Sequence, residues 1–234
     1  TGTLPGTDIA ITKYDVTGTS VVWSSFIGGD RDELPHSLVV DDEHRLLLYG
    51  SSGSFNFPTT SNALDTTFNG GVSFSPQGVG TTYTLGSDIV LVHFSSDGSA
   101  LENATFWGGN GNDGVNTAAG LKFNYADEFR GEIDIAPNGN IVVTGTTMSA
   151  DFPTTLANPN GGMQDAFVTV FDDQLTSVIF SRKLGGSFRR QWGQAISGAA
   201  SPIASSACPR SLKRLDRKRC MYSSPRIGSP RRLA

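Results

Sequence analysis

The sequence predicts an all-β protein built from antiparallel strands. Gly is frequent, with 28 in 234 residues, and apolar residues nowhere follow the 3.6-residue period of a helix. Short apolar runs closed by turn-forming residues also recur in the same order along the chain. The chain is therefore interpreted as an array of repeats.

Each repeat begins with an Asp and an apolar run, and continues to a Gly-Gly pair. The Asp residues are Asp8, Asp88 and Asp165, and the pairs begin at Gly28, Gly108 and Gly185. Both series are spaced by 80 and then 77 residues. The first copy carries 18 extra residues after its Phe-Pro-Thr-Thr motif, and the second carries 15 after its Gly-Gly pair. Without these insertions both spacings become 62 residues, which defines one repeat unit.

The first repeat contains four predicted strands joined by polar loops and turns. They cover residues 9–14, 20–27, 37–40 and 45–50. Gly18 suits the first turn because glycine tolerates a positive φ. We expect Pro35 to help end the loop that follows Gly28-Gly29.

The later repeats follow the same order. The second has strands at 89–94, 100–107, 132–136 and 140–146, and the third has strands at 166–171 and 177–184. Pro137-Asn138-Gly139 lies between two apolar runs and indicates a hairpin. Several runs, such as 46–49 and 141–143, are apolar on consecutive positions, which indicates burial on both faces of the sheet.

A four-stranded sheet packed between two others like it is the blade of a β-propeller. We therefore predict an incomplete propeller in residues 1–187. Its predicted parts are blade 1 at about 8–60, blade 2 at about 88–155 and a partial third blade at 165–187. Phe57 and Phe152 follow the last strand of each repeat, where they can anchor the crossing between blades. Trp23 and Trp107 fall in matching strands and are predicted core residues.

The repeat resembles a known family. Asp-Ala-Phe-Val, Gly-Gly, Pro-Asn-Gly-Asn-Ile-Val-Val-Thr-Gly and Asp-Phe-Pro-Thr-Thr are similar to the motifs of the SBBP family of bacterial β-propeller repeats, over about residues 8–187. The resemblance implies a propeller fragment of a larger secreted or cell-surface protein. It supplies no catalytic residue, because the family's motif residues look structural.

Charge divides the chain after residue 187. Residues 1–187 hold seven Lys/Arg and 21 Asp/Glu, a net charge of −14, whereas residues 188–234 hold 11 Lys/Arg and one Asp, a net charge of +10. No apolar run reaches the length of about 18 residues that a membrane helix needs, so no membrane span is predicted. The basic segment has two interpretations. It is either a tail that binds nucleic acid or a membrane surface, or a segment that never folds. We predict a disordered tail and no nucleic-acid partner.

Residues with catalytic or ligand-binding chemistry are sparse. His36, His44 and His93 are too dispersed to indicate a metal triad, and no Ser/His/Asp or Cys/His arrangement appears. Clustered carboxylates make Asp30, Asp32 and Asp113 candidate calcium ligands; no other cofactor is predicted.

The two inserted loops, 68–87 and 110–131, are expected at one end of the sheets, opposite the short turns. If the propeller binds a ligand, this end is favoured because loops carry recognition. Candidate contacts are the aromatic residues Phe74, Tyr83, Phe123 and Tyr125. The alternative is that these aromatics pack the loops against their own blades.

Two functions remain open. One is a non-catalytic scaffold or adhesion module that binds glycans or proteins and contacts the remaining blades of a larger chain. The other is a propeller enzyme of the glycosidase or lyase type, with carboxylates gathered on one face. The first is favoured because the repeated residues are apolar, Gly, Pro or turn formers.

We predict that residues 188–234 are an out-of-frame translation of the third blade. The period stops in mid-blade, the charge reverses and both cysteines appear only there. With CGN codons for its arginines, residues 188–193 read one base later can encode Ser-Gly-Asp-Asn-Gly-Val, similar to the segment after Gly109. Sequencing the gene tests this prediction. A stop codon soon after the shift, or a shifted frame without Val-Thr-Gly and Phe-Pro-Thr-Thr, would show that the basic tail is genuine.

Overall fold

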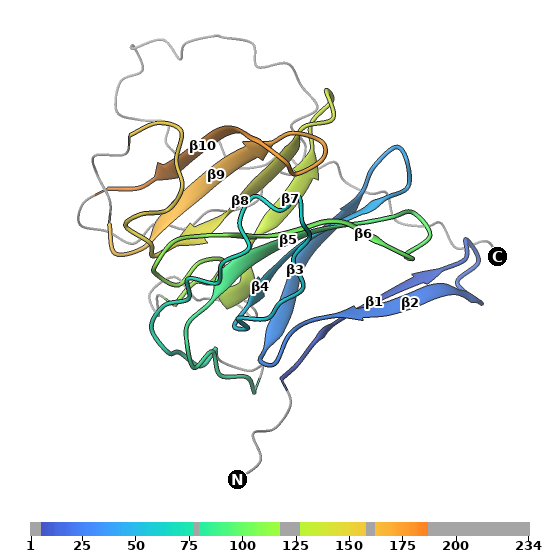
Figure 1. Cartoon of the computed structure of the whole chain (residues 1–234), viewed down its shortest axis with the longest axis horizontal. Coiled ribbons are helices and arrows are strands. Elements are labelled where there is room, and N and C mark those ends of the chain that lie inside the picture. Colours follow the sequence, from blue (N-terminus) through green and yellow to red (C-terminus); the bar gives the residue numbers. More distant parts are fainter. Residues whose placement is uncertain (1–5, 77–79, 118–126, 158–161, 187–234) are drawn as a thin grey trace, which may run out of the picture. The chain divides into compact units, whose positions relative to one another are not determined.

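The computed structural model describes residues 6–76, 80–117, 127–157 and 162–186, which form an all-β fold of antiparallel strands (Figure 1). A strand is present at each of the ten predicted positions. The predicted boundaries agree to within two residues, except that the third strand begins four residues earlier. Residues 188–234, predicted to be a disordered tail, lie outside the described residues, so that prediction stays untested.

The strands form one two-stranded sheet and two four-stranded sheets. The first sheet pairs β1 (Ile9–Tyr14) with β2 (Val21–Ile27). The second has the order β3 (Glu33–Val40), β4 (Leu46–Ser52), β5 (Asp88–Phe94) and β6 (Leu101–Trp107). The third has the order β7 (Glu132–Ile135), β8 (Ile141–Thr147), β9 (Asp165–Phe171) and β10 (Val178–Leu184), and a 3-10 turn, η2 (Asp127–Phe129), precedes it.

The sheets do not coincide with the predicted blades at 8–60, 88–155 and 165–187, and these boundaries were wrong. Each four-stranded sheet joins the last two strands of one repeat to the first two strands of the next. β4 pairs with β5 over seven residue pairs, and β8 pairs with β9 over seven more. The half sheet is therefore β1–β2, while the strands of 165–187 complete the third sheet. The repeat period shows how long a unit is, but not which strands share hydrogen bonds.

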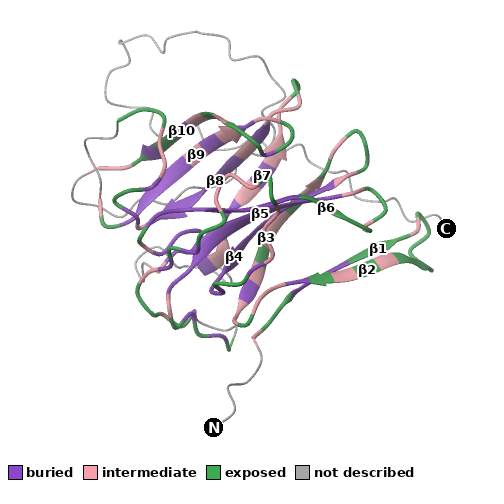
Figure 2. Ribbon diagram, in the orientation of Figure 1, coloured by how far each residue is buried: buried purple, intermediate pink, exposed green. Residues whose placement is uncertain are grey.

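Burial of the second sheet on both faces holds the three sheets together. Every residue of β4 and β5 is buried (Figure 2). Because strand side chains alternate between faces, one set packs with the first sheet and the other with the third. Leu48 and Val90 share a cluster with Ile9, whereas Tyr49 and Leu91 share one with the third sheet. The predicted burial on both faces is confirmed for 46–49, whereas Val142 in the run 141–143 is only partly buried.

The phenylalanines of the two Phe-Pro motifs are buried in the β4–β5 and β8–β9 connections, each of which joins strands of one sheet. Phe152 is buried, with its ring centroid 5.9 Å from that of Trp107 in the second sheet and 4.7 Å from that of Phe167 in the third. Phe57 is also buried, 5.8 Å from Phe106. The Phe-Pro motif was predicted to anchor the crossing between blades, but neither motif lies where the chain passes from one sheet to the next. The predicted core position of Trp107 is confirmed. Trp23 is half-buried and packs against the first cluster.

Pro35 lies within β3 instead of helping to end the preceding loop. β3 is an edge strand of its sheet, and its register with β4 shifts between Pro35 and Ser37. A proline is tolerated there because an edge strand has one side without hydrogen-bond partners, and a bulge absorbs the missing donor.

Five hairpins share one turn geometry. In each, a backbone N–H donates to the carbonyl oxygen three residues earlier, over 2.8–3.3 Å, and the donating residue has a φ between 56° and 86°. These residues are Gly18, His44, Gly98, Gly139 and Leu175. A positive φ is unfavourable for residues with a Cβ, so His44 and Leu175 adopt it at a cost. Leu175 offsets that cost by full burial, whereas His44 is exposed.

We predict opposite effects of glycine at these two positions. His44→Gly should stabilise the protein by about 0.5 kcal/mol, because relief of the left-handed strain exceeds the entropy that glycine adds to the unfolded chain. Leu175→Gly should destabilise it by about 3 kcal/mol, because a buried leucine side chain is lost. Chemical denaturation measures both changes. A destabilised His44→Gly variant would contradict the assignment of strain to this turn.

Candidate functional site

A cleft lies between the hairpins of the second and third sheets, at the end where the short turns gather. Its volume is about 620 Å³. The β3–β4 hairpin forms one side, the β7–β8 hairpin forms the other, and the β9–β10 turn contributes one residue. The lining residues are Val39, Val40, Asp41, Asp42, Glu43, Arg45, Leu47, Asp134, Ile135, Ala136, Pro137, Gly139, Ile141, Val142 and Asp173.

Hydrogen bonds fix the shape of the acidic turn on the first side. The Asp41 carboxylate accepts the backbone N–H groups of Glu43 and Arg45 at 2.9 and 2.8 Å, and the Arg45 Nε–H at 2.7 Å. Burial would raise the pKa of Asp41, but these hydrogen bonds and the guanidinium charge hold it below its ordinary value. Asp41 therefore stays ionised and holds Arg45 in place.

The positive charge of Arg45 is neutralised by three neighbouring carboxylates. Its guanidinium lies 2.7 Å from Asp41, 3.5 Å from Glu43 and 3.6 Å from Glu102. Behind it, His93 is buried with its Nε2 3.6 Å from Asp41. Burial, together with the positive charge of Arg45, lowers the pKa of His93. This histidine is therefore neutral near pH 7 and adds no positive charge to the cleft.

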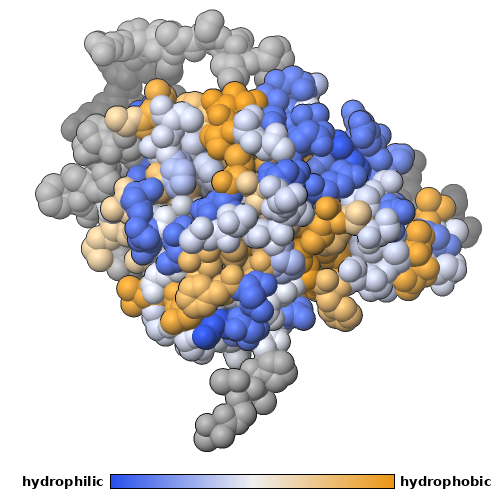
Figure 3. Space-filling view, in the orientation of Figure 1, coloured by the Kyte–Doolittle hydropathy of each residue, from blue (hydrophilic) through white to orange (hydrophobic). Residues whose placement is uncertain are grey.

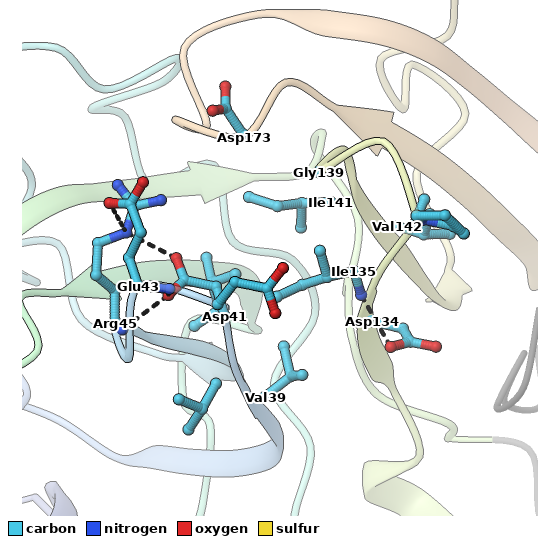
Figure 4. A pocket seen from close by; sticks show the side chains of 15 residues that line it. Val39, Asp41, Glu43, Arg45, Asp134, Ile135, Gly139, Ile141, Val142 and Asp173 are labelled. Carbon is cyan, nitrogen blue, oxygen red and sulfur yellow. Dashed lines mark hydrogen bonds and ion pairs between the residues drawn. The ribbon is translucent and has the colours of Figure 1, made fainter. Parts of the chain in front are cut away.

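Other acidic groups at the cleft have no cationic partner. Asp42 and Asp173 make no ion pair within the described part of the chain, and both are exposed. Asp173 lies beyond Ile141, whereas Asp134 points away from the cleft (Figure 4). Figure 3 shows hydrophilic residues gathered over the β3–β4 and β7–β8 turns. The result is an apolar interior bordered by uncompensated negative charge.

The cleft has the features of a binding surface more than those of a reaction centre. Its unpaired acids are exposed, so they lack the burial that raises the pKa of a general acid. Over the described ranges, no three His, Cys, Asp or Glu side chains form a group able to hold a metal ion. The buried acid pair that the glycosidase hypothesis requires is absent from the lining of this cleft.

Buried carboxylates lie instead at the loop end, where they organise the Gly-Gly motifs. Glu33 accepts the N–H of Gly29 at 2.9 Å and the hydroxyls of Ser52 and Ser54 at 2.7 and 2.6 Å. A Cβ on Gly28 would collide with Asp8 and Glu33. The first position of the Gly-Gly pair therefore needs glycine, because the carboxylates lie too close for a Cβ. The second position contributes a backbone N–H that donates to the buried acid.

The second repeat contains the same arrangement. Asp113 accepts the N–H of Gly109 and the hydroxyl of Ser149, both at 2.7 Å, and a Cβ on Gly108 would collide with it. Burial raises the pKa of Asp113 to about 7. Burial, together with the nearby Asp113, raises the pKa of Asp88 to about 8 despite its hydrogen bonds from backbone N–H groups. These roles were not predicted from the sequence, although Glu33 follows Gly28 and Asp113 follows Gly108 at the same spacing of five residues.

The structure separates the predicted calcium ligands. Asp30 and Asp32 belong to the first Gly-Gly loop, whereas Asp113 belongs to the second. Asp32 accepts backbone N–H groups from Thr7 and Thr82 at 3.0 and 3.3 Å. Asp30 is exposed, and its backbone N–H donates to Asn56. The three carboxylates are thus assigned to two loops, and two of them already serve as hydrogen-bond acceptors.

The inserted loops lie at one end of the sheets, as predicted. Asn112 donates its side-chain N–H to the carbonyl oxygen of Val72 at 2.9 Å, which joins the two loops. Phe74 and Tyr83 stack with centroids 4.9 Å apart, and the Tyr83 hydroxyl lies 3.0 Å from that of Ser51. Tyr83 is 1% exposed, so it packs against its own sheet and offers no surface to a ligand. Phe123 and Tyr125 lie outside the described residues.

Comparisons with known proteins give no assignment. The chain matches no family model and none of the curated proteins. Within the described residues, no helix has the length and hydrophobicity needed to cross a bilayer.

We predict that stability falls between pH 6.5 and 8.5. Asp88 and Asp113 hold protons in the folded state above pH 6.5, whereas an unfolded Asp has lost its proton well below that pH. The folded state therefore binds more protons, and the free energy of unfolding decreases as pH rises through 7 and 8. His36, whose pKa burial lowers to about 3, has the opposite effect only below the unfolded value near 6.5. We expect the Tm to fall by about 3 °C or more over this range.

The variant Asp113→Asn should flatten this decline, because its side chain cannot titrate. Asp97→Asn is the matched control, since hydrogen bonds from the Ser99 backbone and hydroxyl hold the pKa of Asp97 at about 2. The slope of Tm against pH is the measurement, so a general loss of stability in either variant leaves it readable. An unchanged slope in Asp113→Asn would refute the assigned protonation of this site.

Proposed function

We propose that this chain is a non-catalytic β-propeller module of the SBBP repeat type, which acts outside the cell as a scaffold and binding module. The observation that carries the proposal is the central sheet, β3–β6, whose strands β4 and β5 are buried between two other sheets built from equivalent strands. Successive sheets that stack face to face around an axis form a propeller. The repeated Gly-Gly carboxylate arrangements support a common path from each sheet to the next.

The open edge of β1 is an argument for additional strands that pair with it, beyond those described. The equivalent residues Asp8, Asp88 and Asp165 lie at the starts of β1, β5 and β9, with Asp8 directly before the first residue of β1. β5 pairs with β6 along one edge and with β4 along the other, and β9 pairs in the same way with β10 and β8. β1 pairs with β2 along the edge that corresponds to β6 and β10. The equivalent side of β1 has no partner among the described strands. In a complete array, a β3–β4-like hairpin would pair there.

Exposed apolar residues on the first sheet agree with this interpretation. Phe26 is 73% exposed, and Tyr14, Val21 and Val22 are each 56% exposed. Figure 3 shows hydrophobic surface in the region of β1 and β2. Monomeric proteins seldom leave such residues grouped and uncovered. We therefore propose that the remaining blades of a larger chain cover this sheet, and that glycan or protein ligands bind the assembled module.

We predict that the chain self-associates through the open edge of β1. Thr12→Lys should raise the apparent dissociation constant about tenfold, because a charge beside an unpaired edge opposes strand addition. Analytical ultracentrifugation over a range of concentrations measures the effect.

Ser24→Lys is the matched control. Thr12 and Ser24 are paired across β1 and β2, and their hydroxyls lie 2.9 Å apart, so both variants lose the same contact. Ser24 lies on β2, the equivalent of the outer strands β6 and β10. A monodisperse, cooperatively melting wild-type monomer would refute the proposed array, and so would equal effects of the two lysines.

A further inference from the structure

We propose that the cleft between the β3–β4 and β7–β8 hairpins docks an extended peptide in which Lys or Arg alternates with aliphatic residues. The inference rests on the proposed role as a binding module, but it does not depend on additional blades. It moves the expected recognition surface from the inserted loops to the end with the short turns.

The interior of the cleft favours an apolar ligand group. Ile135 faces the β3–β4 side of the cleft, where Val39 lies, whereas Ile141 is 1% exposed and belongs to the core beneath (Figure 4). Val39 and Ile135 both line the cleft and are only partly buried, so apolar area remains uncovered there. The volume of about 620 Å³ lies within the range of established ligand sites, about 300–1,000 Å³. Aliphatic side chains would bury this area without leaving a polar group unsatisfied.

The border of the cleft requires positive charge. Asp42 belongs to the second sheet and Asp173 to the third, so unpaired acids stand on both sides. Arg45 does not neutralise them, because its guanidinium contacts Asp41, Glu43 and Glu102. Residues 1–187 carry a net charge of −14, and the full chain stays acidic at −4 after the +10 of residues 188–234, which favours cations. Anionic ligands such as phosphates or acidic sugars are therefore disfavoured.

An alternating peptide satisfies both requirements at once. In an extended chain, successive side chains point to opposite faces. One face can place aliphatic groups in the cleft while the other carries ammonium or guanidinium groups toward the bordering acids. The methylene stems of Lys and Arg also cover apolar surface while their charged ends remain in water. A small polyamine has the charge but lacks the side groups that the interior would bury.

The test is a fluorescence anisotropy titration of the full chain with a labelled peptide of three Lys-Val repeats. A Lys-Ser peptide of equal charge, a Glu-Val peptide and spermidine as competitor are the comparison ligands. We expect saturable binding of Lys-Val that weakens with salt. We expect binding at least about fivefold weaker for Lys-Ser and none for Glu-Val.

Variants locate the binding surface. Asp42→Asn combined with Asp173→Asn should weaken Lys-Val binding about fivefold, since each exposed charge pair contributes modestly. Val39→Thr should weaken it about twofold to threefold, because it removes apolar contact inside the cleft. Asp30→Asn, an exposed acid in a Gly-Gly loop, is the matched control and should leave affinity unchanged. Circular dichroism and Tm confirm that each variant is folded.

Several results would overturn the proposal. Absence of Lys-Val binding would do so, as would equal binding of Lys-Ser or displacement by spermidine at equal charge concentration. An Asp30→Asn loss equal to that of the double variant would show unspecific attraction to an acidic surface. Thr12→Lys is titrated in parallel and should bind the peptide normally. Failure of the array proposal thus appears in ultracentrifugation, whereas failure of this one appears in the titration.

Discussion

The pairing of β4 with β5 is the interaction on which the described part of the chain depends. Both strands are buried along their whole length, so neither face of their sheet can be left to water. One face carries Leu48 and Val90 toward the first sheet, and the other carries Tyr49 and Leu91 toward the third. Because this pairing joins strands from two different repeats, it also links consecutive repeats into one structure. Loss of either neighbouring sheet would expose a full apolar face.

The connections between sheets are stabilised in an unusual way, by buried acids. Glu33 and Asp113 lie in water-excluded positions, where a carboxylate costs free energy unless hydrogen bonds or a proton compensate. Backbone N–H groups of Gly29 and Gly109 and nearby hydroxyls supply the hydrogen bonds. The raised pKa of Asp113 shows that this compensation is partial. The crossings are therefore specific in geometry but sensitive to pH.

The turn chemistry of the hairpins also shapes the surface. Tight turns favour Asp because its carboxylate accepts nearby backbone N–H groups, as Asp41 and Asp172 do. Antiparallel strands bring these turns to one end of neighbouring sheets, so acidic residues gather there. The ends of β3, β4, β7 and β8 leave apolar side chains between the turns. An acidic border around an apolar interior thus follows from the requirements of the fold, and it becomes a surface suited to cationic partners.

Sequence alone determined the elements of this protein. Short apolar runs, closed by turn-forming residues, located all ten strands, and matching spacings indicated the repeat. These signals are local, because each depends on a residue and its near neighbours. Sequence also indicated burial on both faces, since consecutive apolar residues project to both sides of a strand.

Tertiary structure decided which strands share a sheet and which polar residues meet. The half sheet proved to be β1–β2 because pairing across the long insertion aligns β4 with β5, and a period carries no information on phase. Tyr83 looked like a loop residue available to a ligand, but its burial against the second sheet depends on contacts far apart in sequence. Asp42 and Asp173 are 131 residues apart and looked like ordinary turn residues. Only the packing of two sheets places them around one cleft, because side chains gather by position in space and not by order in the chain.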